Sequence, residues 1–179
     1  MVVDRLASYV VAYIECDVQI GHALRRAFDF IDCFQREGRY LNRNNRPRHP
    51  LSGKIFRQQQ VAELCLNEMP FVSPSAREML SNYETTKNHS GLQITCDHVI
   101  PVRCMEQMLR DAHSATPLTP DYVLEFHSLH FRRAIIAREE NAKLNLEYRH
   151  RMPDSWNGNA EENFARYHAV GFDWAADWK

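Results

Sequence analysis

The chain has 179 residues, a hydrophobic content of 44% and a formal net charge of −1, which suffices for one domain, or for one domain with a sizeable extension. It contains no apolar run of the roughly 18 residues that a membrane-spanning helix needs, and Asp4 and Arg5 interrupt the apolar stretch where a signal peptide would lie. We therefore expect a soluble intracellular protein with no membrane partner, or one exported by a route that the sequence does not show.

The cysteines point to a reducing compartment. Their number is odd and no two of them form a Cys-x-x-Cys pair; they are Cys16, Cys33, Cys65, Cys96 and Cys104. This pattern argues against a disulfide framework and against a zinc finger. The sequence therefore predicts a cytoplasmic location.

The near-neutral net charge hides a strongly basic segment between residues 36 and 57. One acid, Glu37, stands there against seven basic residues, so that the segment carries +6 and the rest of the chain −7; the basic residues are Arg36, Arg39, Arg43, Arg46, Arg48, Lys54 and Arg57. Such a segment can be a solvated linker. It can equally contact the phosphates of a nucleic acid, which would make binding strongly dependent on salt. The sequence leaves both interpretations open.

The first half of the chain is expected to be helical. Apolar residues recur at helical spacing over residues 6–18 and again over 20–34, which predicts one long helix over about 3–37 or two helices broken near Gly21. This stripe suits a core or a homodimer interface. Residues 38–53 have little periodicity and are expected to form a loop, and two short helices should follow at 58–68 and 75–84, the second opened by Ser73-Pro74.

The periodicity changes after residue 91. Alternation of apolar and polar residues over 92–96 predicts a strand that leads into Asp97-His98, and Pro101 ends it. Helices are expected at 103–113 and 120–130. A second strand is expected at 132–137, followed by a helix at 139–149 with acids in its first turn and a last helix at 160–169.

Asp97, His98 and Asn141 are the candidate functional residues. A carboxylate at a strand end can bind a divalent metal ion, and the neighbouring imidazole can take a proton from water. Asn141 lies in the helix that follows the second strand. An isolated Asp-His pair is more commonly a surface turn with a capping aspartate, so the strand context and Asn141 favour the metal site.

This order of elements resembles the HNH endonuclease superfamily. The matching motifs are Asp97-His98-Val99-Ile100-Pro101 and the segment 134–145, and the resemblance covers roughly residues 90–150. It implies an α+β fold, predominantly helical, with a ββα-metal core in the C-terminal half. The domains would be a helical N-terminal region at 1–88, whose basic loop 36–57 serves DNA contact or dimerisation, and a nuclease core at 89–179 with inserted helices and a helical tail.

The resemblance also implies the roles of the site residues. His98 would be the base, and one Mg²⁺ or Mn²⁺ ion would lie between Asp97 and Asn141, in which case the middle residue of the family motif falls near His127 or His130. In a second register Asn141 is that middle residue and His150 is the metal ligand. The second register requires residues 142–145 to form a strand, which their β-propensity disfavours.

The implied activity is hydrolysis of DNA phosphodiester bonds that leaves 5′-phosphate and 3′-hydroxyl ends, as in restriction or phage-type endonucleases. The basic residues from Arg39 to Arg57 would contact the DNA. Two alternatives stay open: a nuclease toxin acting on DNA or RNA, and a DNA-binding protein that keeps the scaffold without catalysis.

Overall fold

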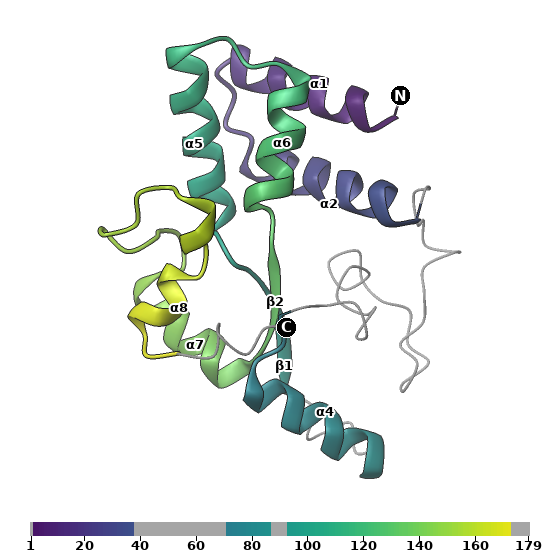
Figure 1. Cartoon of the computed structure of the whole chain (residues 1–179), viewed down its shortest axis with the longest axis vertical. Coiled ribbons are helices and arrows are strands. Elements are labelled where there is room, and N and C mark those ends of the chain that lie inside the picture. Colours follow the sequence, from purple (N-terminus) through teal and green to yellow (C-terminus); the bar gives the residue numbers. More distant parts are fainter. Residues whose placement is uncertain (1, 38–70, 87–92, 173–179) are drawn as a thin grey trace. The chain divides into compact units, whose positions relative to one another are not determined.

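The computed structural model describes residues 2–37, 71–86 and 93–172 and shows an α+β chain that is mostly helical, as the sequence predicts (Figure 1). No helix in these ranges is long and apolar enough to span a bilayer. The elements, in chain order, are α1 (Val2–Glu15), α2 (Gly21–Glu37), α4 (Pro74–Thr86), β1 (Ile94–His98), α5 (Val102–Ala115), α6 (Pro120–His130), β2 (Arg133–Ala137), α7 (Arg138–Glu147), the 3₁₀ turn η2 (Ala160–Glu162) and α8 (Ala165–Ala169).

Most predicted elements are confirmed, with shifts at their ends. The predicted helix at 160–169 is instead the turn η2 followed by α8. The physical reason is Asn163 between them: its side chain is buried, donates to the carbonyl of Leu129 at 2.8 Å and lies 3.3 Å from Nδ1 of His130. The predicted loop at 38–53 and helix at 58–68 lie outside the described residues.

The residues group into two compact units that are not consecutive along the chain. One unit comprises Met1–Tyr40, Ile100–Arg132 and His150–Asn163, and the other comprises Leu41–Val99, Arg133–Arg149 and Phe164–Lys179. The sequence predicts a single division of the chain, at residue 88. The helices inserted between the two strands, α5 and α6, belong to the same unit as α1 and α2.

The N-terminal stripe forms two helices, which decides between the two sequence-based interpretations. The chain turns between α1 and α2 at Asp17, whose φ is 50°. Two side chains of α5 hold this turn: Glu106 accepts the N–H of Ile20 at 3.0 Å, and Arg110 donates to Asp17 at 2.6 Å. The buried part of the stripe forms the core of this unit and includes Ala7, Val10, Ile14, Ile20, Leu24, Phe28 and Ile31.

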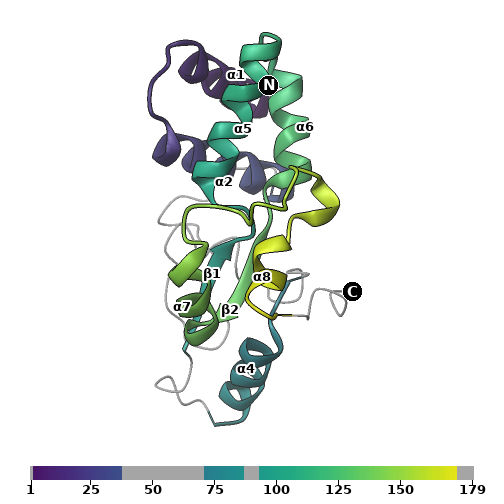
Figure 2. The same ribbon diagram turned by 90° about the vertical axis from the view of Figure 1, so that its left-hand side faces the viewer.

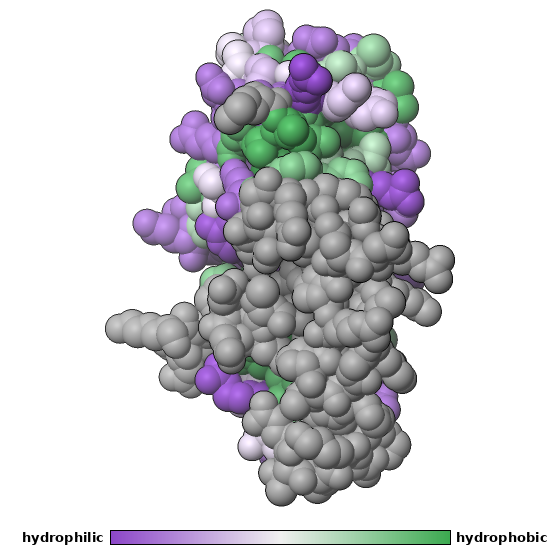
Figure 3. All heavy atoms as spheres, turned by 90° about the vertical axis from the view of Figure 1, so that its right-hand side faces the viewer, coloured by the Kyte–Doolittle hydropathy of each residue, from purple (hydrophilic) through white to green (hydrophobic). Residues whose placement is uncertain are grey.

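Part of the stripe on α1 stays exposed to solvent. Val2, Tyr9 and Tyr13 have exposed fractions of 47%, 61% and 43%. On the face shown in Figure 3, apolar side chains gather over the unit that contains the N-terminal helices. A homodimer through these helices stays a prediction.

In the other unit, β1 pairs antiparallel with β2 and β2 runs directly into α7 (Figure 2). The register places Asp97 opposite Ala134 and His98 opposite Arg133. The segment before α4 covers the other edge of β2, because Val72 bridges Ile135, Ser73 donates to the Ile135 carbonyl and Ile135 donates to the Phe71 carbonyl. Every residue of β2 is buried as a result.

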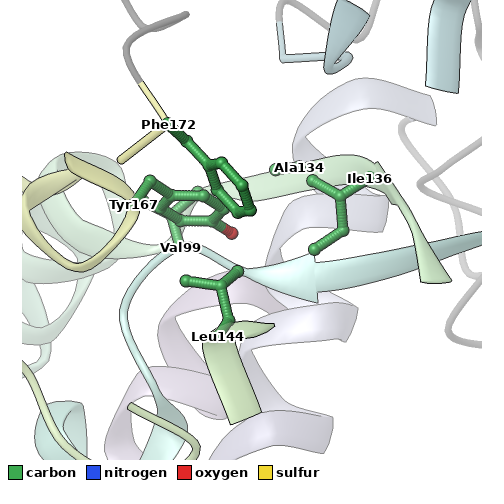
Figure 4. Packing of buried hydrophobic residues seen from close by; sticks show 6 residues of the cluster. All are labelled: Val99, Ala134, Ile136, Leu144, Tyr167 and Phe172. Carbon is green, nitrogen blue, oxygen red and sulfur yellow. The ribbon is translucent and has the colours of Figure 1, made fainter. Parts of the chain in front are cut away.

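A single apolar cluster holds α7 and α8 against the strand pair. Leu144 of α7 and Tyr167 of α8 are both fully buried in it, and Figure 4 shows them converging on the strands; its members are Val99, Ala134, Ile136, Leu144, Tyr167 and Phe172. Burying a side chain of this size contributes about 1.5–3 kcal/mol. This packing holds α7, which carries Asn141, against the strand pair, which carries Asp97 and His98.

Candidate functional site

Asp97 and His98 occupy the last two positions of β1, and their side chains lie on opposite faces of the strand pair. Successive residues of a strand alternate between faces. Asp97 shares its face with its partner Ala134, which belongs to the cluster beneath α7 and α8. His98 shares the face of Cys96 and Ile135, the face that packs against Ala76 of α4. The two candidate residues are therefore neighbours in the backbone whose side chains leave opposite faces of the strand pair.

The carboxylate of Asp97 is engaged by two side chains of α8. The hydroxyl of Tyr167 donates to Oδ2 at 2.5 Å, and Nη2 of Arg166 forms an ion pair with the same oxygen. The side chain of Arg166 is 2% exposed and that of Asp97 17%. Both bonds go to Oδ2, so neither of them occupies Oδ1.

Arg166 also ties together the ends of β1 and α7. Its Nε donates to the carbonyl of Val99 at 2.8 Å, its Nη1 to the carbonyl of Tyr148 at 3.1 Å, and its Nη2 to the carbonyl of His98. Tyr148 caps the C-terminal end of α7, directly after its last residue, Glu147. One guanidinium thus joins the strand end that carries Asp97 and His98 to the helix that carries Asn141.

Burial dominates the ionisation of this cluster. It raises the pKa of the Asp97 carboxyl above its usual value, although the charge of Arg166, the hydroxyl of Tyr167 and the backbone of His98 act in the opposite direction. Burial also raises the pKa of Tyr167 well above its usual value, and the neighbouring Asp97 raises it further. Tyr167 is therefore a permanent hydrogen-bond donor to Asp97 at neutral pH.

Asn141 is the fourth residue of α7 and is half-buried. In the described part of the chain no hydrogen bond engages its side chain. The helix α7 runs without a break through residues 142–145, so the strand that the second register requires is not formed. The prediction of a helix in this place is confirmed, and its end lies at Glu147 rather than at residue 149.

His150 lies beyond α7 and belongs to the other compact unit. Its carbonyl accepts the thiol of Cys104 at 3.4 Å within that unit. The structure therefore groups Asp97, His98 and Asn141 in one unit and does not add His150 to them.

The two histidines near which the family's middle residue was expected are core residues of α6. Nε2 of His127 lies 3.2 Å from the carbonyl oxygen of Phe28, and the His127 ring stacks on Phe131. Nδ1 of His130 lies 3.3 Å from the Asn163 side chain. Both histidines are buried in the unit that contains α1, α2, α5 and α6, called the helical unit below. Their contacts there are those of packing residues.

The donor chemistry fits a hard divalent cation, with one restriction. Mg²⁺ and Mn²⁺ prefer carboxylate and amide oxygens, and Oδ1 of Asp97 and the side chain of Asn141 supply such oxygens. The restriction is that Arg166 and Tyr167 hold Oδ2, so Asp97 can offer one oxygen. Among the described residues, three or more His, Cys, Asp or Glu side chains nowhere gather into a metal-binding group.

A cleft of about 520 Å³ lies beside the start of α7, between that helix and α4. Its lining holds three acidic residues, Glu78, Glu139 and Glu140, against one basic residue, Lys143, and includes none of the candidate residues. The cleft is therefore not part of the candidate site.

The sequence places Arg166 and Tyr167 in a short terminal helix and does not indicate a role for either of them. No local pattern marks them, because an Arg-Tyr pair is ordinary in a helix and its partners stand about 70 positions earlier. The basic residues assigned to DNA contact (Arg39, Arg43, Arg46, Arg48, Lys54 and Arg57) lie outside the described residues.

Comparison of the chain with models of protein families, with curated proteins and with solved structures finds no match.

Proposed function

We propose that this protein is a metal-dependent endonuclease that hydrolyses phosphodiester bonds of DNA. The observation that carries the proposal is the pairing of β1 with β2 and the direct run of β2 into α7, with Asp97-His98 at the end of β1 and Asn141 in the first turns of α7. This is the order of elements and residues that the ββα-metal nucleases share.

In the proposed mechanism each residue has one role. His98 takes the proton from the attacking water, as a neutral imidazole can near pH 7. Asp97 and Asn141 would hold one Mg²⁺ or Mn²⁺ ion, and that ion would supply Lewis-acid chemistry at the phosphate. The basic residues between Arg39 and Arg57 hold the DNA backbone.

The first test is cleavage of plasmid DNA in Mg²⁺ or Mn²⁺ by the parent chain and by His98→Ala. Loss of a general base lowers a rate by about 10²–10⁴-fold, and we expect a loss in that range. His22→Ala, an exposed histidine of α2, is the matched control and should cleave like the parent. If His98→Ala cuts as fast as the parent, the mechanism is wrong.

A second test concerns the helix-borne ligand. Asn141→Ala should weaken Mn²⁺ binding and slow cleavage, whereas the exposed Asn145→Ala, one turn further along the same helix, should do neither. His150→Ala belongs in the same series, measured by calorimetric titration with Mn²⁺. If His150→Ala weakens Mn²⁺ binding and Asn141→Ala does not, His150 is the metal ligand, as the second register has it.

Two observations favour a second candidate function, a DNA-binding protein that keeps the scaffold without catalysis. The Asp97 carboxylate is already paired with Arg166, and His98 points to the other face of the strands. A parent chain that binds DNA in a salt-dependent way but shows no cleavage with either metal would support this candidate. A homodimer through the N-terminal helices and a cytoplasmic location complete the proposal.

A further inference from the structure

We propose that Arg166 and Tyr167 are positioning residues that make Asp97 a one-oxygen ligand, an inference that rests on the proposed metal-dependent function. Both residues come from α8, outside the segment that carries the proposed site. They act on the ion only through Asp97, and they determine which of its oxygens is presented.

The guanidinium of Arg166 is a fixed group. Three backbone carbonyls, those of His98, Val99 and Tyr148, accept its N–H groups independently of Asp97. With its side chain 2% exposed, Arg166 has no room to rotate toward solvent. It therefore defines a position to which the Asp97 carboxylate is drawn, and Asp97 does not determine where Arg166 lies.

The two donors converge on one carboxylate oxygen. Nη2 of Arg166 and the hydroxyl of Tyr167, 2.5 Å away, both reach Oδ2, so its lone pairs are used. A carboxylate held in this way cannot turn Oδ2 toward a cation without breaking two hydrogen bonds and leaving two buried donors without an acceptor. The backbone N–H of His98 is a third donor to the carboxylate, and Oδ1 is the oxygen that neither side chain of α8 holds.

The same arginine links the two elements that carry the proposed ligands. Its bonds to the carbonyls of Val99 and Tyr148 join the end of β1 to the end of α7. Asn141 lies on that helix and Asp97 on that strand. Outer residues that orient ligands in this manner commonly contribute 10–100-fold to metal affinity or activity.

The decisive variant is Tyr167→Phe, because it removes one hydroxyl and keeps the ring in the apolar cluster. We expect the apparent dissociation constant for Mn²⁺ to rise about 10-fold or more, with the KM for plasmid DNA unchanged and the melting temperature close to that of the parent. Tyr122→Phe, an exposed tyrosine of α6, is the control for loss of a hydroxyl and should leave Mn²⁺ affinity at the parent value.

Arg166→Lys is the second variant. It keeps the positive charge but cannot serve the carbonyls and the carboxylate together, so Mn²⁺ affinity should fall at least as far. If this variant loses its cooperative unfolding transition, Tyr167→Phe decides alone.

The outcomes separate this inference from the proposed function. A parent that binds Mn²⁺ and cleaves DNA, with Tyr167→Phe equal to it in Mn²⁺ affinity, overturns the positioning role and leaves the function standing. A parent that neither binds Mn²⁺ nor cleaves DNA overturns the proposed function and this inference with it. A fall in Mn²⁺ affinity confined to Tyr167→Phe and Arg166→Lys supports both.

Discussion

At the scale of single residues, Arg166 is a buried charge whose hydrogen-bond partners come mainly from the backbone. Arg166 is almost wholly buried, and burying an unpaired charge would cost several kcal/mol. Three carbonyls and one carboxylate offset that cost. Replacing such a residue by one that lacks the fork of donors would leave these carbonyls without partners, so the conservative variants proposed above are the informative ones.

His130 is the residue whose titration should show in the stability of the helical unit. Burial lowers its pKa below the usual 6.5, and the charge of Arg132 lowers it further, while the hydrogen bond to Asn163 acts in the opposite direction. The unfolded chain therefore binds the proton more tightly than the folded state does. The stability that neutral His130 contributes is present above pH 6.5 and is lost as the pH falls from there toward its folded pKa.

We accordingly expect His130→Gln to flatten the dependence of the melting temperature on pH between about pH 7.5 and 5.5. The comparison is made by thermal unfolding at a series of pH values. His22→Gln, at an exposed position of α2, should keep the slope of the parent. A slope unchanged by His130→Gln would show that other groups cause the acid destabilisation.

At the scale of elements, one carboxylate joins the starts of α4 and α7. Oε2 of Glu140 accepts the hydroxyl of Ser73 at 2.5 Å and the backbone N–H of Ala137 at 2.7 Å. The Ser73 oxygen in turn accepts the N–H of Ala76 at 3.1 Å and so caps α4. The helix dipole favours acids at the start of α7, and Glu140 in addition links two helices.

Glu140→Gln should therefore destabilise the protein by about 2 kcal/mol, the order expected when a hydrogen bond to a charged group is weakened. Glu139→Gln is the matched control, because Glu139 is the preceding residue of the same helix and is exposed. Urea denaturation gives the free energy of unfolding of both variants. Equal losses for the two would mean that the helix dipole, and not the link to Ser73, accounts for the effect.

At the scale of the whole molecule, the charge is divided between a basic segment and an acidic remainder. Residues 36–57 carry +6 and the rest of the chain −7, and the segment from residue 38 onward lies outside the described residues. A basic segment that contacts DNA releases counterions, and the logarithm of the affinity then falls linearly with the logarithm of the salt concentration.

Replacing Arg43, Arg46 and Arg48 by Gln should reduce that salt slope by up to about 3, since each lost phosphate contact removes about 0.9. Fluorescence anisotropy with a duplex between about 50 and 200 mM salt measures it. Arg5, Arg26 and Arg149, three exposed arginines elsewhere, form the control set. If both triple variants keep the parent slope, the segment is a solvated linker.

Helices and strands with strong local signals could be predicted from the sequence. The start of α4 at Ser73-Pro74, the start of α6 at Thr119-Pro120 and the helical character of residues 139–147 follow from capping and periodicity. The start of the last helix could not be predicted, because Asn163 turns the chain through contacts with Leu129 and His130, which are more than 30 positions away.

The candidate site, like the helices and strands, could be predicted from the sequence only in part. By itself the sequence determined that Asp97 and His98 stand at a strand end and that Asn141 lies in the helix after the second strand, because hydrophobic periodicity is a local property. Only the tertiary structure decided that Asp97 is held by Arg166 and Tyr167, that α4 packs on the face of the strands that carries His98 and that α5 and α6 belong to a different unit from the strands they connect. The physical reason is that these arrangements depend on burial and on hydrogen bonds between residues about 70 positions apart, which no short stretch of sequence encodes.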